Sequence, residues 1–197
     1  MSHRCWGDAV YRYFLVDTHG WRLVAHVLAP IVWFQIALLM SGVYARYNAA
    51  QQGRPLEETP FFDEAVAVLR LDSVAASDGV QTAFLFYVLD AVNALLLCAG
   101  FAALIGFGLR ALRTQGPLVW AALAAPLILC AAELTENAFL AMALAMPASQ
   151  GTLGGIAGVG TGIKFLAFAL SALFALTALI AGLGAWTWRR MREEKRR

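Results

Sequence analysis

Four long apolar stretches, separated by more polar segments, constrain this chain more than any other feature. They occupy residues 23–45, 80–109, 117–146 and 163–188. An α-helix needs about 20 apolar residues to cross roughly 30 Å of hydrocarbon, so each stretch is long enough to span a bilayer. Apolar residues form 60% of the chain and charged residues 14%, which departs from a soluble domain in the direction of a membrane protein. We therefore predict an all-α fold, a four-helix transmembrane bundle that forms a single membrane domain.

Basic residues are concentrated on one side of the predicted bundle. They precede the first stretch, separate the second from the third and follow the fourth: Arg4, Arg12, Arg22, Arg110, Arg113, Arg189, Arg190, Arg192, Lys195, Arg196 and Arg197. The outer loop over residues 46–79 carries only Arg46, Arg54 and Arg70. The positive-inside rule therefore places both termini in the cytoplasm. Because the charge follows topology, we expect no nucleic acid among the partners, and the lipid bilayer is the first partner.

Two further segments are predicted to form short interfacial helices. Residues 6–16 combine apolar side chains with arginines, as a helix at the cytoplasmic surface would. In the outer loop, Thr59 is a suitable N-cap and Pro60 a suitable first helical residue, and apolar residues then recur at helical spacing: Phe62, Ala65, Val66 and Leu69. A plain loop is the alternative there. The glycine-rich residues 151–162 lack the Gly-Lys-Ser/Thr ending of a phosphate loop, so we expect a flexible outer connection.

Ionisable residues inside the predicted spans are the main candidates for function. Each is expensive to insert, by about 2.5–3.5 kcal/mol, so its presence in a span calls for an explanation. The ionisable residues are Asp90, Glu133, Glu136 and Lys164, and two amides, Asn93 and Asn137, accompany them. We treat this group as a candidate binding site, with no catalytic residue assigned.

Counting residues along the helices predicts that these polar side chains meet. Asp90 on the second span and Glu136 on the third each lie about 15 Å from the outer end, and Asn93 and Glu133 lie about 20 Å from it. Residues three or four apart share a helix face, which adds Tyr87 and Asn137 to the group. Gln35 on the first span can reach the same level. We therefore predict a polar cluster inside the bundle, in its outer half or near mid-depth.

Lys164 opens the fourth span at its outer side, and its direction is left open by the sequence. It either extends outward to the headgroups or turns inward to pair with Glu136 or Asp90. If it turns inward, three carboxylates face one cation, and at least one of them should hold a proton near neutral pH. Proton-coupled sites have this property, and so do inert hydrogen-bonded networks that fix helix register.

Other chemistries find less support in the sequence, and we predict no cofactor and no metal. The histidines do not pair at haem-ligand spacing, and Glu133-x-x-Glu136 lacks the histidine of the di-iron motif. A hard cation held by Asp90, Glu133 and Glu136 is the chemically allowed alternative. Cys5, Cys98 and Cys130 are predicted to be free thiols. Ala167, Ser171 and Ala175 form a face of small residues that suits either the bundle interior or a partner subunit.

The order of the polar residues resembles that of a group of uncharacterised bacterial four-helix membrane proteins. The shared signature has Tyr-x-x-Asp on the second span, Asp/Glu-x-x-Glu-Asn after a proline on the third, and Thr-x-x-Lys at the fourth. The matching residues here are Tyr87, Asp90, Pro126, Glu133, Glu136, Asn137, Thr161 and Lys164. The chain departs in having Glu133 where aspartate is usual. The resemblance implies a multi-pass protein of the bacterial inner membrane and supplies no activity.

Three functional hypotheses follow. The first is a non-enzymatic inner-membrane protein, such as an accessory subunit of a larger membrane complex, in which other membrane subunits or a second copy are the partners. The second is a small proton- or cation-coupled transporter that uses the carboxylates. The third is an enzyme acting on a lipid or isoprenoid, with a carboxylate as general acid or base. A cavity that reaches the cluster favours the second and third hypotheses, and a sealed cluster favours the first.

Overall fold

The computed structural model describes residues 13, 20–114 and 116–195, and within these it is helical. Four of its helical segments are long and apolar enough to cross a membrane, which confirms the helical class and the four candidate spans. The predicted surface helix over residues 6–16 lies outside the described residues, apart from Tyr13. Cys98 and Cys130 are free, as predicted, and Cys5 also lies outside the described part.

The first crossing consists of α2 (Trp21–Trp33) and the π-helix η2 (Phe34–Met40). It ends earlier than the predicted residue 45 because Gly42 adopts a left-handed conformation with φ of 72°, which glycine tolerates and which breaks the helix. The chain then restarts as α3 (Val43–Gln51), a separate short helix. The hydroxyl of Ser41 donates to the carbonyl of Ala37 at 2.6 Å and so satisfies part of the helix end.

The outer loop contains a helix, as predicted, although it begins later. After the short 3-10 helix η3 (Leu56–Glu58), α4 runs over Glu64–Ala76, and its N-cap is Asp63, whose side chain accepts from the amide of Val66 at 2.9 Å. The predicted start at Thr59 is wrong: its hydroxyl donates back to the carbonyl of Pro55. The predicted apolar face is also only partly correct, because Leu69 is exposed and the buried residues of α4 are Ala67, Leu71 and Val74.

Three long helices complete the chain: α5 (Val80–Leu112), α6 (Pro117–Ala145) and α7 (Gln150–Glu194), with the 3-10 helix η4 (Pro147–Ser149) before the last. The predicted flexible connection over residues 151–162 is wrong, because these residues form the first turns of α7. The glycines allow α7 to approach the preceding segments closely. A Cβ at Gly154 would collide with Ala67, and one at Gly158 would collide with the backbone carbonyl of Phe62.

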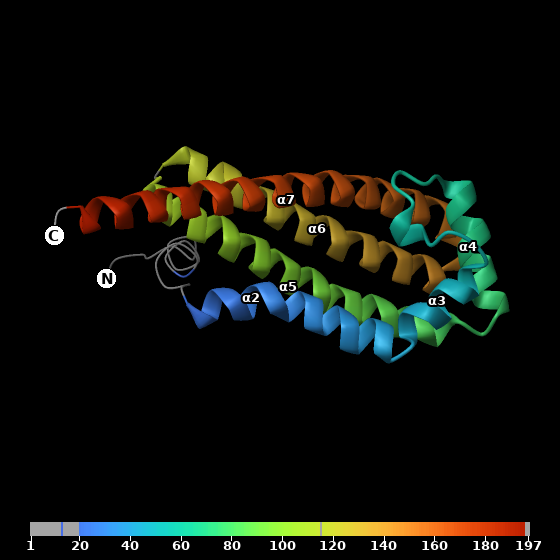
Figure 1. The fold of residues 1–197 in the computed structure, drawn as a ribbon. Helices are drawn as coiled ribbons and strands as arrows, with labels where there is room; N and C mark the ends of the chain where they lie inside the picture. The colour runs from blue at the N-terminus through green and yellow to red at the C-terminus, as the bar shows by residue number, and fades with distance from the viewer. Residues whose placement is uncertain (1–12, 14–19, 115, 196–197) are drawn as a thin grey trace, which may run out of the picture.

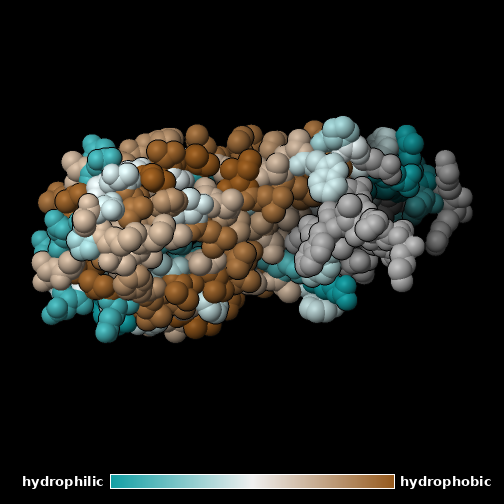
Figure 2. Space-filling model, turned by 180° about the vertical axis from the view of Figure 1, so that it is seen from behind, coloured by the Kyte–Doolittle hydropathy of each residue, from teal (hydrophilic) through white to brown (hydrophobic). Residues whose placement is uncertain are grey.

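The long helices run side by side, with α3 and α4 gathered at one end and the start of α2 and the end of α7 at the other (Figure 1). We call the first the capped end and the second the basic end, because Arg110, Arg113, Arg189 and Arg192 lie there. Helices α5, α6 and α7 pack against one another, whereas α2 packs chiefly on α5. Seen from behind, apolar side chains form a broad band between more hydrophilic ends (Figure 2).

The buried apolar residues form two clusters. The larger lies at the capped end and includes Leu38, Tyr47, Leu71 and Phe86. The smaller joins α5, α6 and α7 nearer the basic end and is centred on residues such as Ile105. The face of small residues on α7 turns inward: Ala167, Ser171 and Ala175 are all buried, and the Ser171 hydroxyl donates to the carbonyl of Ala167 at 2.7 Å. This face therefore serves the bundle interior.

Close approach of α5 and α7 depends on Gly108, where a Cβ would collide with the backbone of Ala178. We predict that Gly108→Ala lowers the free energy of unfolding in detergent by about 1–3 kcal/mol, because overpacking forces the two helices apart. The matched control is Gly184→Ala, since a Cβ at Gly184 meets nothing within 4 Å. There the gain in helix propensity, up to about 1 kcal/mol, should leave stability unchanged or raised. Equal effects of the two substitutions would refute the close contact.

Candidate functional site

A buried hydrogen bond joins α5 and α6 at the predicted polar residues. Asn137 Nδ2 donates to Asp90 Oδ2 at 3.0 Å, and both side chains are buried. Asp90 sits about one third of the way along α5, and Asn137 lies at the corresponding level of α6 because the two helices are antiparallel neighbours. The structure therefore brings together two of the residues that the sequence placed at matching depths.

Lys164 of α7 turns inward and pairs with both glutamates of α6. Its Nζ lies 2.7 Å from Glu136 Oε2 and 3.2 Å from Glu133 Oε1. The side chain of Glu136 is fully buried, and those of Lys164 and Glu133 are 10% and 15% exposed. Of the two directions left open by the sequence, the inward one is the one observed. These ion pairs link α6 to α7, and the hydrogen bond between Asn137 and Asp90 links α6 to α5.

The remaining predicted residues surround these contacts. Asn93 follows Asp90 by one turn of α5, and its Oδ1 is buried without a hydrogen-bond partner among the described residues. Oδ1 of Asn137 and Oε1 of Glu136 are also buried and have no hydrogen-bond partner among the described residues. Gln35 on η2 is exposed and does not enter the cluster. A buried acceptor without a donor is destabilising, so these oxygens are the atoms that a ligand or a proton would satisfy.

A residue that sequence reasoning missed, Glu57, brings a further carboxylate from the cap. It is buried in η3, accepts from the hydroxyl of Tyr47 at Oε1 and accepts from Gln51 Nε2 at Oε2, 3.2 Å away. The hydroxyls of Tyr47 and Tyr87 are 2.7 Å apart, so Tyr87 connects this network to α5. Gln51 also accepts from the amide of Leu56 at 2.9 Å and so positions the loop. No periodicity in the outer loop marks Glu57 as a buried residue.

The cap network and the cluster interact electrostatically. Burial raises the pKa of Glu57 above its ordinary value of 4.5, while the hydrogen bond from Tyr47 and the positive charge of Lys164 oppose the rise. Burial also raises the pKa of Tyr47 well above 10.0, helped by the nearby charge of Glu57. Because Lys164 acts on Glu57 as well as on Glu133 and Glu136, one ammonium serves carboxylates from the cap and from α6.

The cluster therefore holds more carboxylates than cations. Lys164 pairs with Glu133 and Glu136, while Asp90 bonds to Asn137 and Glu57 feels the charge of the same lysine. Burying uncompensated charge is strongly unfavourable, so the excess is balanced either by protons or by a positively charged ligand. In the described ranges 20–114 and 116–195, no three His, Cys, Asp or Glu side chains are arranged to hold a metal ion.

The cluster lies nearer the capped end of the helices than the basic end. Trp21, Trp120 and Trp186 lie in the parts of α2, α6 and α7 near the basic end, and tryptophan is enriched at membrane interfaces. From there, Glu136 lies about 24 Å along α6 and Lys164 about 33 Å along α7, at 1.5 Å per residue. Hydrocarbon is about 30 Å thick. The first turns of α7 pack against α4 and the loop before it, so the start of this helix belongs to the cap.

Two cavities meet at the cluster. The smaller, about 230 Å³, is lined at its polar side by Asn93, Glu133 and Lys164 and elsewhere by Ala94, Leu97, Leu129, Phe165 and Phe168. The larger, about 450 Å³, lies between α2, α5 and α7, and its lining is apolar except for Gln35 and Asn93: Val27, Pro30, Ile31, Phe34, Leu97, Gly100, Phe101, Leu104 and Phe168. Asn93, Leu97 and Phe168 line both.

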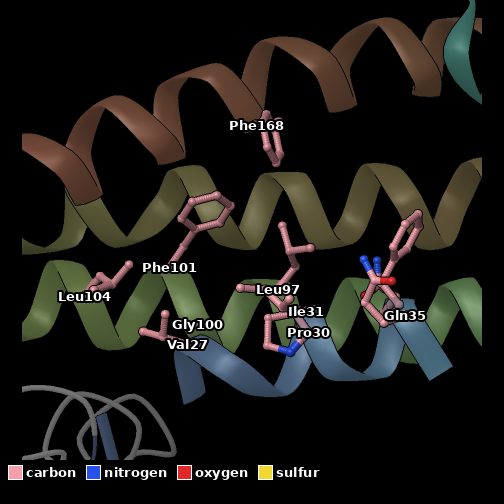
Figure 3. Close-up of a pocket in the computed structure, with 11 residues that line it drawn as sticks. Val27, Pro30, Ile31, Gln35, Leu97, Gly100, Phe101, Leu104 and Phe168 are labelled. Carbon is pink, nitrogen blue, oxygen red and sulfur yellow. The ribbon is translucent and has the colours of Figure 1, made fainter. Parts of the chain in front are cut away.

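The larger cavity is bounded by helices that do not close over it. Residues Val27, Pro30 and Ile31 of α2 and Leu97 of α5 form one side, and Phe168 extends from α7 toward α5 on the other (Figure 3). Because α2 packs chiefly on α5, the space between α2 and α7 is occupied by this cavity. Its shared residues Asn93, Leu97 and Phe168 connect it to the smaller cavity beside Glu133 and Lys164.

No protein-family model, curated protein or solved structure matches this chain. The function must therefore be argued from the geometry of the cluster and its cavities.

The ion pair of Lys164 is testable through stability. We predict that Lys164→Met lowers the free energy of unfolding in detergent by about 3–5 kcal/mol, because it leaves two buried carboxylates without a cation. Adding Glu136→Gln to Lys164→Met should restore part of the loss, since one uncompensated charge is then removed. Lys195→Met, at an exposed position of the basic end, is the matched control and should be neutral. If Lys164→Met unfolds with the same free energy as wild type, the ion pairs of Lys164 do not stabilise the fold.

The raised pKa of Glu57 predicts a pH dependence. Above pH 4.5 the unfolded chain loses this proton while the folded protein still holds it, so stability falls as the pH rises from 4.5 through the folded pKa. Glu57→Gln should remove this part of the slope. The measurement is the difference between the unfolding free energies of wild type and variant across that range. Parallel curves would show that Glu57 titrates as it does in the unfolded chain.

Proposed function

We propose that this protein binds an amphiphilic molecule from the membrane, with its apolar chain between α2, α5 and α7 and its polar end at Asn93, Glu133 and Lys164. The observation that carries the proposal is the meeting of an apolar cavity and a polar one at Asn93, Leu97 and Phe168. An amphiphile is the class of ligand whose two parts match the two cavities. In this function the protein is a non-enzymatic membrane protein that holds a ligand.

The size and chemistry of the site support this assignment. A volume of about 450 Å³ falls in the range of roughly 300–1,000 Å³ that small-molecule sites occupy. Such sites are mostly apolar with a few polar groups that fix orientation, and here Asn93 offers a buried acceptor that lacks a donor. A hydroxyl or amine at the polar end of the ligand would donate to it.

The orientation of the protein belongs to the same proposal. With the basic end in the cytoplasm and the capped end outside, in the inner membrane of a bacterium, the arginines follow the positive-inside rule. The site then lies at the level of the outer leaflet. A molecule of that leaflet reaches the cluster sideways, past α2, while the cap of α3, η3 and α4 covers it from outside.

A purely structural cluster is the second candidate. The ion pairs of Lys164 and the hydrogen bond between Asn137 and Asp90 already satisfy much of the cluster from within the protein. This supports an accessory subunit whose polar residues fix helix register, with other membrane subunits or a second copy as partners. A transporter or a lipid-acting enzyme would use the same cavity, with Glu133 as the carboxylate that lines it.

Filling the cavity tests the proposal. Leu97 lines both cavities, and we expect Leu97→Trp to reduce binding of a fluorescent single-chain amphiphile, in mild detergent, by tenfold or more. The matched control is Leu95→Trp, on the same helix but 55% exposed, which should bind like wild type. Equal binding by the two variants would exclude this cavity. Co-purification of a stoichiometric protein, with no retained amphiphile, would favour the accessory subunit.

A further inference from the structure

The basic end carries a second site, which is independent of the polar cluster. Two cavities of about 490 and 470 Å³ flank Arg189 between the ends of α5 and α7, and both are lined by Ala111, Arg113, Arg189 and Glu193. Arg110 adds to the lining of one and Arg192 to that of the other. We call this pair of cavities the basic groove. Four arginines and a single glutamate give it a net positive charge.

Arg189 holds the two helix ends together and divides the groove. Its Nη2 donates to the carbonyl of Ala111 in the last turn of α5, and its Nε donates to the carbonyl of Ala185 at 3.1 Å. A guanidinium bonded to helix carbonyls in this way is fixed in place. Arg192 is also ordered, because its guanidinium lies 5.0 Å from the ring centroid of Trp188. The guanidinium groups of Arg189 and Arg192 are therefore held in fixed positions in the groove.

The position of the groove indicates what occupies it. Trp186 and Trp188 line its two halves, and tryptophan is the residue most enriched, with tyrosine, at the level of lipid headgroups. Exposed apolar side chains flank the arginines on the same helices: Leu112 on α5, and Leu183 and Met191 on α7, of which Leu183 lies on the bundle side of Trp186. A ligand with an anion at headgroup level and apolar chains below it matches both parts. Basic pockets between helix ends at the membrane surface bind lipid headgroups in this way.

We infer that the basic groove binds the anionic headgroup of a phospholipid, with the phosphate among Arg110, Arg113, Arg189 and Arg192 and the acyl chains along the outer faces of α5 and α7. Arginine suits this role because its planar donors pair with phosphate oxygens in a bidentate manner. The site does not depend on the amphiphile proposed for the polar cluster, which lies at the opposite end of the bundle.

The test compares two pairs of substitutions in the full-length protein. Arg110→Gln with Arg113→Gln removes two charges from the groove, and Arg46→Gln with Arg54→Gln removes two exposed charges at the capped end. Retained phosphatidylglycerol and phosphatidylcholine are counted by native mass spectrometry after titration into mild detergent. We expect the groove pair to weaken phosphatidylglycerol binding at least tenfold, at about fivefold per arginine. The capped-end pair should leave it unchanged.

Several results would overturn the inference. They are equal losses in the two pairs, phosphatidylcholine binding as tight as that of phosphatidylglycerol, or inorganic phosphate competing as well as the lipid. Arg192→Gln provides a second measurement, at an exposed residue of α7 where substitution does not disturb helix packing. It should weaken phosphatidylglycerol binding about fivefold while the thermal unfolding midpoint stays that of wild type. Unchanged binding in this variant would also count against the site.

Discussion

The buried ion pair between Lys164 and the glutamates of α6 is the interaction on which the rest of the site depends. A buried lysine needs anionic partners, and Glu133 and Glu136 supply them from the neighbouring helix. Their geometry fixes the register of α7 against α6, while Asn137 and Asp90 fix α6 against α5. Because desolvation offsets much of the attraction between buried charges, these polar contacts add little net stability. Their main effect is to fix how the helices align.

The cluster is covered on the side of the cap, whereas a cavity adjoins it between α2, α5 and α7. Gln51 and Glu57 fasten the loop over the capped end, so that the cluster is covered from the aqueous side. Toward the membrane, α2 rests on α5 and leaves a cavity open against α7. A cluster covered by the cap, beside a cavity lined by apolar side chains, is the physical reason for proposing a membrane amphiphile as the ligand rather than a soluble molecule.

Several features were predictable because they follow from one helix at a time. Asp90 and Asn137 could be matched in depth because neighbouring helices are antiparallel and each residue advances the helix by a fixed rise. The wrong predictions concern segments whose conformation depends on packing against distant parts of the chain. The glycines of residues 151–162 look flexible in isolation, yet they are helical because α4 and the loop before it pack against them. Thr59 is a suitable cap in sequence, but Asp63 makes the observed capping bond.

The sequence by itself determined that the chain is helical, where four helices long and apolar enough to span a membrane lie, and which polar residues they carry, because hydrocarbon thickness and backbone hydrogen bonding favour helices for such stretches. Only the tertiary structure decided that Lys164 points inward, that Glu57 joins the network from the cap, and that a cavity reaches Asn93. These depend on how segments distant in the chain pack together. Spacing along one helix fixes a face and a depth, and it does not fix which neighbour meets that face.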